Sequence, residues 1–153
     1  MTNVNNQTIT LKEITKETIW PIMNLEVADN QVTLVAPNAN SIAEAYYSRE
    51  AAWFRGIYLG EQPVGFVMLH VETDEPEYFL WRLMIDKNHQ RKGYGYQAML
   101  QVIDHVKTLP GATELKTSYV PREGNPSPFY YKLGFEETGE MLEGEKVLKL
   151  SFK

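Results

Sequence analysis

The sequence predicts one α+β domain that covers residues 1–153. The first observation is the order of its periodic segments, which run strand, two helices, three strands, helix, strand, helix and two strands. The second is continuity, because no repeat, low-complexity tract or linker separates these segments. The third is length, since 153 residues are enough to bury one hydrophobic core and are most simply one domain.

Strands are expected where apolar and polar residues alternate, or where an apolar run is bounded by turn residues. The first segment alternates throughout, and the second and third flank a short turn, which predicts a hairpin. The last two lie on either side of Gly144. The expected strands are residues 7–14, 51–59, 63–71, 77–85, 114–120, 136–141 and 146–152.

Helices are expected where apolar residues recur at helical spacing behind a capping residue. Thr15 is the expected cap of the first helix, with Pro21 in its first turn, and Ser41 is the expected cap of the second. Asn125 is the expected cap of the fourth, and Gly134 its C-terminal stop. The expected helices are residues 18–25, 42–49, 94–108 and 126–133.

Composition excludes several classes of site. The chain has no cysteine, so disulfides, zinc–thiolate sites and a cysteine nucleophile are excluded. His70, His89 and His105 do not have the spacing of metal ligands, so we expect no metal site and interpret the three as incidental. The formal net charge of −5 argues against a general nucleic-acid-binding protein, which would carry a basic face.

The sequence gives no indication of a membrane or an export route. There is no run of about 20 apolar residues, which a membrane-spanning helix would need. Residues 1–10 lack the basic start and apolar stretch of a secretory signal. We therefore expect a cytoplasmic protein without a membrane partner.

A glycine-containing loop at residues 90–95 joins an apolar strand to an amphipathic helix. Gly93 and Gly95 permit backbone angles and close approaches that a Cβ would block. Free N–H groups of a first helical turn favour an anion, and Arg91 and Lys92 add positive charge beside them. The loop suits a phosphate or pyrophosphate, although taken alone it suits an ordinary strand–helix connection equally well. It matches neither a Rossmann nor a Walker loop.

A second motif is the aromatic helix end before Gly134. Phe129 and Leu133 share a helix face, which favours packing into the core. One of the adjacent tyrosines, Tyr130 and Tyr131, must then point elsewhere. A tyrosine hydroxyl at a cleft can donate a proton to a leaving group of high pKa.

Taken together, the two motifs resemble those of the GNAT superfamily of N-acetyltransferases, and the element order is similar over nearly the whole chain. Residues 31–38, 41–45 and 81–86 further resemble bacterial spermine/spermidine (diamine) acetyltransferases. The resemblance implies a single GNAT domain with a mixed, mostly antiparallel sheet of about seven strands. It also implies that the fourth and fifth strands splay apart and that four helices flank the sheet.

The resemblance implies acetyl-CoA as cosubstrate and no metal. The pyrophosphate would lie on residues 90–95 and the pantetheine arm along the backbone of residues 83–85. The asparagine that relatives carry near the pantetheine falls here at Glu123, so Asn125, two residues later, is either a CoA contact or a helix cap. The implied cofactor-binding residues are Leu83, Met84, Ile85, Gln90, Arg91, Lys92, Gly93, Tyr94, Gly95, Tyr96, Asn125 and Lys132.

The resemblance also implies that an amine attacks the thioester directly, without an acyl-enzyme. Tyr130 takes the position of the general acid that protonates the leaving thiolate, and a backbone N–H near Ile85 would stabilise the oxyanion. Many relatives carry a glutamate as general base where this chain has Trp81. Glu77, Glu26 or a water chain would then take the proton, unless the amine arrives neutral. Deprotonating the ammonium form of the amine in solution costs about 1.4 kcal/mol for each unit by which the pH lies below its pKa.

The acceptor implied by the closer resemblance is a polyamine such as spermidine or spermine. Trp81 fits a wall against the aliphatic part of that amine, and equally well a core aromatic residue on a central strand. Glu26 and Glu44, in the two N-terminal helices, are the acidic residues expected to hold an amine. A protein N-terminus or an antibiotic amine is the alternative acceptor, and a non-catalytic acyl-CoA sensor is the alternative of another class. Relatives are often homodimers, and the sequence is compatible with a homodimer without requiring one.

Overall fold

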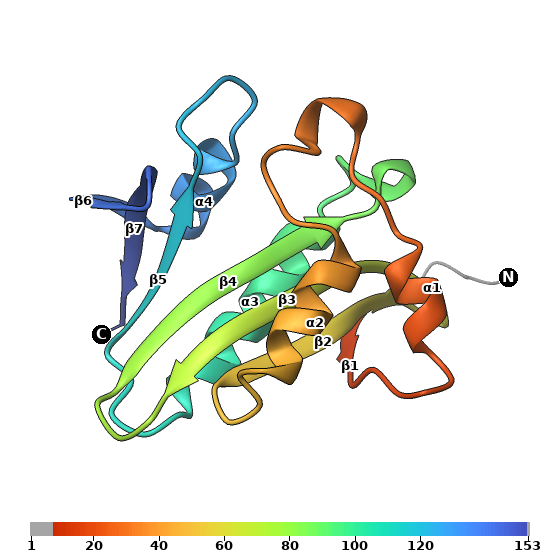
Figure 1. Ribbon diagram of the computed structural model, residues 1–153. Coiled ribbons are helices and arrows are strands. Elements are labelled where there is room, and N and C mark those ends of the chain that lie inside the picture. Colours follow the sequence, from red (N-terminus) through yellow and green to blue (C-terminus); the bar gives the residue numbers. More distant parts are fainter. Residues whose placement is uncertain (1–7, 153) are drawn as a thin grey trace, which may run out of the picture.

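The computed structural model describes residues 8–152, which form one mixed sheet with helices on both faces (Figure 1). Seven strands follow the spatial order β1-β2-β3-β4-β5-β7-β6. Neighbouring strands are antiparallel except β4 and β5, which are parallel. The predicted sheet is confirmed. The strands are β1 Ile9–Lys12, β2 Ala52–Leu59, β3 Gln62–Glu72, β4 Glu77–Ile85, β5 Glu114–Tyr119, β6 Glu136–Leu142 and β7 Glu145–Ser151.

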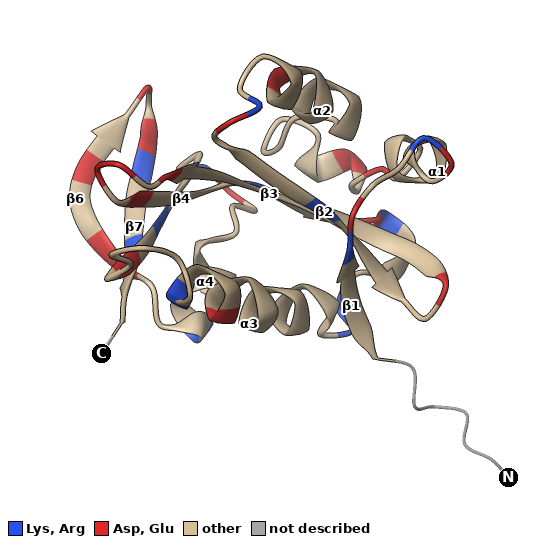
Figure 2. Ribbon diagram, turned by 90° about the horizontal axis from the view of Figure 1, so that it is seen from below, with Lys and Arg blue, Asp and Glu red and all other residues tan. Residues whose placement is uncertain are grey.

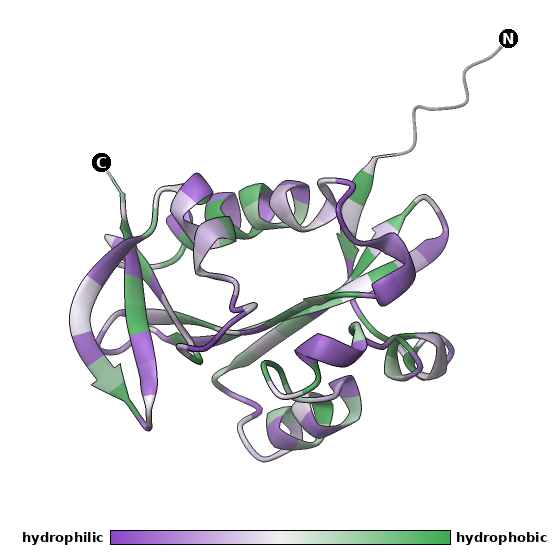
Figure 3. Cartoon of the chain, turned by 90° about the horizontal axis from the view of Figure 1, so that it is seen from above, coloured by the Kyte–Doolittle hydropathy of each residue, from purple (hydrophilic) through white to green (hydrophobic). Residues whose placement is uncertain are grey.

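The α-helices lie in two layers, with α1 and α2 on one face of the sheet and α3 and α4 on the other (Figure 3). The four predicted helices are confirmed, although the first two begin at other residues. No helix within residues 8–152 has the length and apolar character that crossing a membrane requires. The helices are α1 Ile19–Met23, α2 Asn38–Tyr46, α3 Tyr94–Lys107 and α4 Ser127–Leu133, with the 3₁₀ turns η2 Asp29–Gln31 and η3 Lys87–His89.

Three predicted boundaries in the N-terminal third need correction. The predicted first strand is observed from Ile9, and Gln7 lies outside the described residues. Thr15 does not cap α1, because its carbonyl accepts the backbone N–H of Thr18 in a turn that precedes the helix. Ser41 does not cap α2 but lies inside it, fully buried.

The start of α2 is fixed by a contact that no local pattern reveals. The buried side chain of Asn38, the first residue of the helix, donates a hydrogen bond of 2.8 Å to the carbonyl of Ile22 at the end of α1. Because this bond ties the first residue of α2 to the end of α1 and satisfies the buried Asn38 side chain, it favours the earlier start.

Two apolar layers hold the sheet between its helices. The larger layer packs against α3 and α4, and burying its apolar surface supplies much of the stability of the fold. Its buried members are Ile9, Ile57, Val64, Val67, Leu69, Tyr78, Leu80, Ala98, Met99, Val102, Ile103, Val106, Leu115, Tyr119, Tyr130, Phe135 and Leu148. The smaller layer packs against α1 and α2, and its buried members are Ile22, Ala45, Tyr58, Phe66, Met68 and Met84.

Strands β4 and β5 are paired only near their beginnings. The parallel register joins Phe79 with Lys116 and Leu80 with Thr117, whereas β4 continues to Ile85. Beyond Leu80 the two strands separate, as Figure 1 shows. The predicted splay between the fourth and fifth strands is confirmed.

A β-bulge lies where the separation begins. Met68 of β3 is opposite Arg82, and the next β3 residue is opposite Leu80, so Trp81 is the extra residue. A bulge bends its strand and increases the local twist, which turns β4 away from β5. It also directs two consecutive side chains to one face. Trp81 packs on the smaller layer, and Arg82 reaches Glu44 of α2 on the same side.

Candidate active site

A cleft of about 1130 Å³ opens where β4 leaves β5. Its walls come from these two strands, from the segment between α1 and α2 (residues 24–37, the α1–α2 segment), from the start of α3, from α4 and from the turn between β6 and β7. Figure 1 shows the α1–α2 segment and the loop before α4 on opposite sides of the diverging strands. The cleft therefore brings together parts of the chain that are far apart in sequence.

The start of α3 presents free backbone N–H groups, the feature expected of an anion site. Gly93 precedes the helix with a left-handed φ of 83°, and no side chain caps the helix. The backbone N–H of Gln97 donates to the carbonyl of Gly93 at 3.1 Å, so the N–H groups of Tyr94, Gly95 and Tyr96 precede the bonds within the helix. These groups and the dipole of a 14-residue helix fit the expected pyrophosphate.

Three cations surround this anion site. Arg91, Lys92 and Lys132 are exposed, and within residues 8–152 none of them forms an ion pair. Arg91 and Lys132 line the cleft, whereas Lys92 does not. Arg91 has a left-handed φ of 64° that carries the chain into the helix start. The charges are therefore available to phosphate groups.

The edge of β4 beyond Leu80 forms the floor of the cleft. The Thr117 hydroxyl donates to the carbonyl of Leu80 at 3.1 Å, which closes the paired part of the two strands. Leu83, Met84 and Ile85 all line the cleft and have strand partners in β3 alone within the described residues. An unpaired strand edge offers backbone groups to an extended ligand, so these residues fit the expected pantetheine arm.

The side chain of Gln90 is directed away from the anion site. Its amide nitrogen donates to the Gln31 side-chain oxygen at 2.7 Å and to the carbonyl of Ile85 at 2.8 Å. Its own oxygen accepts a hydrogen bond of 3.2 Å from the Gln31 amide. Both amide donors are thus used, and the contribution of Gln90 to a phosphate site comes from its backbone.

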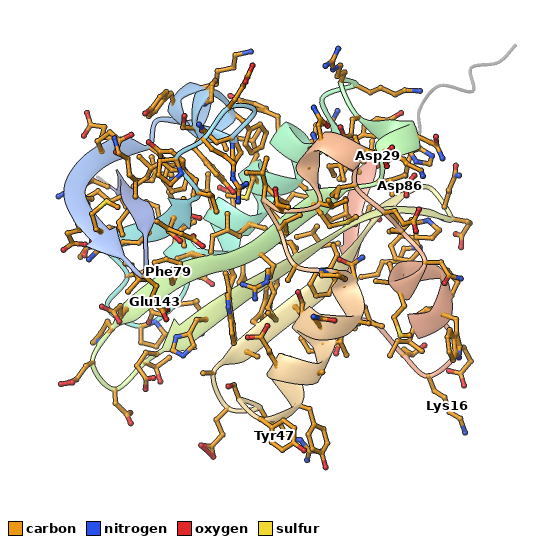
Figure 4. All side chains as sticks on the ribbon, turned by 45° about the horizontal axis from the view of Figure 1, so that its top comes forward. Lys16, Asp29, Tyr47, Phe79, Asp86 and Glu143 are labelled. Carbon is orange, nitrogen blue, oxygen red and sulfur yellow. The ribbon has the colours of Figure 1, made fainter. Side chains whose placement is uncertain are left out.

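Asp86, directly after β4, is a positioning residue that the sequence analysis missed. Its carboxylate is buried and accepts the backbone N–H groups of Glu26 at 2.9 Å and Asn88 at 3.1 Å. The N–H of Lys87 donates to the carbonyl of Glu26 at 2.7 Å. Figure 4 shows Asp86 close to the segment that carries Asp29. The α1–α2 segment is therefore tied to the end of β4.

Tyr130 projects into the region between the splayed strands. Its side chain is buried between Phe129 and Phe135, whose ring centroids lie 5.3 and 5.4 Å from its own. Burial raises the pKa of Tyr130 to about 12, while a hydrogen bond with the Thr117 side chain acts in the opposite direction. The hydroxyl therefore keeps its proton at neutral pH and is a donor, as its expected role requires.

The adjacent Tyr131 points out of the cleft. Its hydroxyl donates to the Glu137 carboxylate, which also accepts the hydroxyl of Tyr119 at 2.6 Å. Hydrogen bonds from Tyr119 and Tyr131 lower the pKa of Glu137, and burial followed by the bond to Glu137 raises that of Tyr119. This cluster joins β5, α4 and β6, and of its three members Tyr119 lines the cleft whereas Tyr131 and Glu137 do not.

The carboxylates expected near the amine lie in different places. Glu77 is exposed and lines the cleft. Glu26 does not line it, because its carboxylate pairs with Lys87 at 3.1 Å on the outer side of the α1–α2 segment. Glu44 also lies outside the cleft lining, paired with Arg82 at 2.8 Å. The structure therefore brings Glu77 to the cleft, but not the other two.

Trp81 combines both of its expected environments. It is half-buried against the smaller apolar layer, and it lines the cleft. The ring of His70 lies edge-on to it with a centroid distance of 5.9 Å, and the guanidinium carbon of Arg82 lies 5.6 Å from its ring centroid. His70 lines the cleft as well, although its sequence context gave no sign of this.

The turn between β6 and β7 adds two carboxylates that the sequence analysis missed. Glu143 and Glu145 line the cleft, and Glu145 accepts the Ser118 hydroxyl at 2.7 Å. Figure 2 shows acidic residues along β6 and around this turn. Pairing of β7 with β5, joining residues distant in sequence, brings the turn to the cleft.

Asn125 lies directly before Pro126, the N-cap residue of α4, and its side chain satisfies a backbone N–H at the helix start. Its side-chain nitrogen donates to the carbonyl of Arg122 at 2.7 Å, and its oxygen accepts the N–H of Ser127 at 2.8 Å. Its neighbours Gly124 and Pro126 line the cleft, whereas Asn125 does not. Of the two interpretations, this geometry supports the helix cap.

Metal ligands do not gather in the described part of the chain. Within residues 8–152, no group of three or more His, Asp or Glu side chains is arranged to hold a metal ion. The site is therefore built from backbone N–H groups, cations, aromatic rings, carboxylates and the buried hydroxyls of Thr117, Tyr119 and Tyr130.

Several solved structures share this fold. The paia N-acetyltransferase from Thermoplasma acidophilum, in complex with coenzyme A, has a TM-score of 0.73 at 16% identity, over 95% of this chain and 99% of that chain. A GNAT family acetyltransferase from Elizabethkingia anophelis with acetyl-CoA bound has a TM-score of 0.70 at 14% identity, over 97% of this chain and 100% of that chain. Arabidopsis thaliana Naa50 in complex with the bisubstrate analogue CoA-Ac-MVNAL has a TM-score of 0.69 at 19% identity, over 94% of this chain and 99% of that chain.

The sequence also matches a family model directly. Residues 19–135 match the model described as the Acetyltransferase (GNAT) family, whereas no curated protein sequence matches the chain. The matched range contains the splayed strands, the anion site at the start of α3 and Tyr130. The chain therefore belongs to the GNAT family of acetyltransferases, and acetyl-CoA is its acyl donor.

Proposed function

We propose that this acetyltransferase transfers the acetyl group directly to a primary amine, and that the amine belongs to a polyamine such as spermidine or spermine. The observation that carries the proposal is a group of three carboxylates, Glu77, Glu143 and Glu145, that line the same cleft as Tyr130. Within residues 8–152 none of the three carboxylates forms an ion pair. They are available to a cationic acceptor.

A polyamine fits these groups because it presents ammonium groups separated by methylene chains. One amine must reach the reaction site, while a second needs a carboxylate at a distance. Glu77 and Trp81 are four residues apart on β4, which corresponds to roughly 13 Å at about 3.3 Å per residue. Phe79 and Trp81, which also line the cleft, offer apolar ring faces to the methylene chain and a cation–π surface to an ammonium group.

The chain's own residues divide the work of the reaction. Acetyl-CoA supplies an activated thioester. The N–H groups at the start of α3 hold the pyrophosphate, with Arg91 and Lys132 beside it. The unpaired edge of β4 orients the arm, and the Tyr130 hydroxyl donates a proton to the departing sulfur. Direct attack needs no nucleophilic side chain, which agrees with a chain that has no cysteine.

A substrate screen tests the proposal. Purified protein is mixed with acetyl-CoA and release of free thiol is followed with spermidine, spermine, a short diamine and a monoamine of equal length. We expect turnover with the polyamines and a preference for them over the monoamine. Absence of thiol release with every polyamine and diamine would overturn the proposal.

A peptide N-terminus is the second candidate acceptor. Naa50, one of the structural neighbours, was solved with an analogue that joins CoA to the peptide MVNAL. The cleft here opens between the α1–α2 segment and the β6–β7 turn, which leaves space for an extended chain. Short peptides with free N-termini therefore belong in the same screen, and turnover with peptides alone would favour this candidate.

A further inference from the structure

We infer that His70 takes the proton from the reacting amine, an inference that rests on the proposed function above. The question arises because a substrate amine is mostly protonated at neutral pH and must lose a proton to attack and a second as the amide forms. Neither Glu26 nor Glu44 lines the cleft. A proton acceptor must therefore come from another part of the site.

The reaction site is located by the Tyr130 hydroxyl. The Thr117 side chain influences the pKa of this hydroxyl and so lies beside it, and the Thr117 hydroxyl donates to the carbonyl of Leu80 at 3.1 Å. A sulfur that receives the Tyr130 proton must come within hydrogen-bonding distance of this hydroxyl. The amine therefore approaches close to Leu80 and Trp81, where β4 separates from β5.

His70 lies across the β3–β4 ladder from this point. It is paired with Phe79, the residue before Leu80, and paired residues of antiparallel strands have Cα atoms about 5 Å apart. Met68 belongs to the smaller apolar layer and Leu69 to the larger one, so the alternation of β3 directs His70 to the side of Trp81. The centroid distance of 5.9 Å between the His70 and Trp81 rings agrees with this.

The imidazole has capacity to accept a proton. It lines the cleft, and within residues 8–152 its ring nitrogens form no hydrogen bond or ion pair. A neutral imidazole carries one acceptor nitrogen, and histidine is the side chain whose ordinary titration lies closest to neutral pH. Glu77 is more distant, since it precedes Trp81 by four strand residues, roughly 13 Å at about 3.3 Å per residue.

Charged groups of both signs share the sheet face with His70. Arg82 is neutralised by Glu44 of α2, and β2 presents the uncharged Ala52 directly opposite His70. The charged groups on the elements around His70 are Glu72 of β3, Glu77 and Arg82 of β4, Glu44 of α2, Lys116 of β5, and Glu143 and Glu145 at the β6–β7 turn.

The proposed step balances as follows in atoms and charge. The ammonium group first passes a proton to the free ring nitrogen of His70, and the imidazolium releases that proton to solvent. The neutral amine nitrogen then forms a bond to the thioester carbonyl carbon, the carbon–sulfur bond breaks, and the departing sulfur takes the Tyr130 proton. The second proton of the nitrogen passes to His70, and the imidazolium returns it to the tyrosinate through solvent. The products are the acetylated amine and the free thiol.

The test compares four proteins over a range of pH: the unmodified enzyme, His70→Gln, His70→Ala and His105→Gln. His70→Gln keeps a polar planar side chain but removes the acceptor of suitable basicity. His105→Gln is the matched control, because His105 stacks on Trp53 at 4.6 Å on the α3 side of the sheet, outside the cleft lining. CoA binding, measured by calorimetry, reports whether each variant keeps its folded donor site. The kcat/KM for the polyamine is then measured from pH 6 to pH 10.

We expect His70→Gln to lower kcat/KM about 100-fold at pH 7, the lower end of the range for general-base catalysis. The loss shrinks toward pH 10, where the amine is increasingly neutral by itself, and added imidazole partly rescues His70→Ala at pH 7. An equal loss at every pH without rescue, or no loss, would overturn the role of His70. Absence of turnover in the unmodified enzyme would overturn the proposed function instead, so the two failures are distinguishable.

Discussion

The side-chain amides of Gln31 and Gln90 form a reciprocal pair, with bonds of 2.7 and 3.2 Å. Gln31 belongs to η2 in the α1–α2 segment, and Gln90 begins the loop before α3. The pair therefore joins the α1–α2 segment to the loop that precedes α3, two walls of the cleft. Together with Asp86, which accepts the N–H of Glu26, it fixes the α1–α2 segment against the end of β4.

Breaking this pair is expected to weaken the binding of both substrates together. Gln31→Ala removes three neutral hydrogen bonds of about 1 kcal/mol each, the two to Gln90 and the one accepted from the backbone N–H of Ala28. We therefore expect KM for acetyl-CoA and for the amine each to rise roughly fivefold, with a smaller effect on kcat. Asn30→Ala is the matched control, since Asn30 is an exposed neighbour in η2. Steady-state kinetics with each substrate varied in turn measure both constants. A rise in only one KM would contradict the coupling.

Removing the Tyr130 hydroxyl is expected to lower turnover without loss of the donor site. Tyr130→Phe should reduce kcat about 100-fold, at the low end of general-acid effects, because a CoA thiolate is a good leaving group. The Thr117 hydroxyl keeps its bond to the Leu80 carbonyl, so the fold should tolerate the change. Tyr131→Phe is the control, because that hydroxyl faces Glu137 outside the cleft. Turnover by Tyr130→Phe at the unmodified rate would remove the proposed role.

The same tyrosine predicts how stability changes at alkaline pH. Its pKa is about 12 in the folded protein, against an ordinary value of about 10, so the unfolded chain releases this proton first as pH rises. Tyr130 therefore contributes full stability below pH 10, and that contribution is lost between about pH 10 and 12. At the upper end the loss approaches about 3 kcal/mol.

Chemical denaturation at several pH values measures how steeply the free energy of unfolding falls as the pH rises. Tyr130→Phe should flatten the fall in unfolding free energy above pH 10. Some slope should persist, because burial and the bond to Glu137 raise the pKa of Tyr119 in the same direction. Identical slopes in the two proteins would contradict the buried, protonated state of the Tyr130 hydroxyl.

Replacing Gly93 is expected to affect both stability and CoA affinity. A left-handed φ costs a non-glycine residue roughly 1–2 kcal/mol, and a Cβ at Gly93 would meet no atom within 4 Å, so backbone strain accounts for the stability effect. Gly139→Ala is the matched control, because Gly139 has a φ of 86° and equally open surroundings in β6. Both variants should lose similar stability, and calorimetry should show weaker CoA binding for Gly93→Ala alone. Equal CoA affinity would contradict the anion site.

Sequence patterns predicted the features that depend on local periodicity. The start of α3 at Tyr94 and the complete range of β4 follow from alternation, helical spacing and glycine positions within a few residues. The cap at Ser41 was wrong because the bond from Asn38 to Ile22 joins two helices. Local propensity therefore predicts the presence of an element more accurately than it predicts the residue at which the element begins.

The amine side of the cleft depends on contacts distant in sequence. Glu143 and Glu145 reach it through the pairing of β7 with β5, and His70 reaches it through the register of β3 with β4. Glu26 and Glu44, which the sequence favoured, turn to Lys87 and Arg82 instead. Side-chain direction near a bulge also follows from the partner strand and not from the strand itself.

The most direct test of the central claim compares a polyamine with a monoamine of equal chain length. We expect the unmodified enzyme to prefer spermidine in kcat/KM, and Glu143→Gln to lower that preference roughly two- to fivefold, as for an exposed ion pair. Glu136→Gln is the control, since Glu136 is an exposed carboxylate of β6 outside the cleft lining. Equal kcat/KM for the two amines, with no effect of Glu143→Gln, would contradict recognition of a polyamine by the cleft carboxylates.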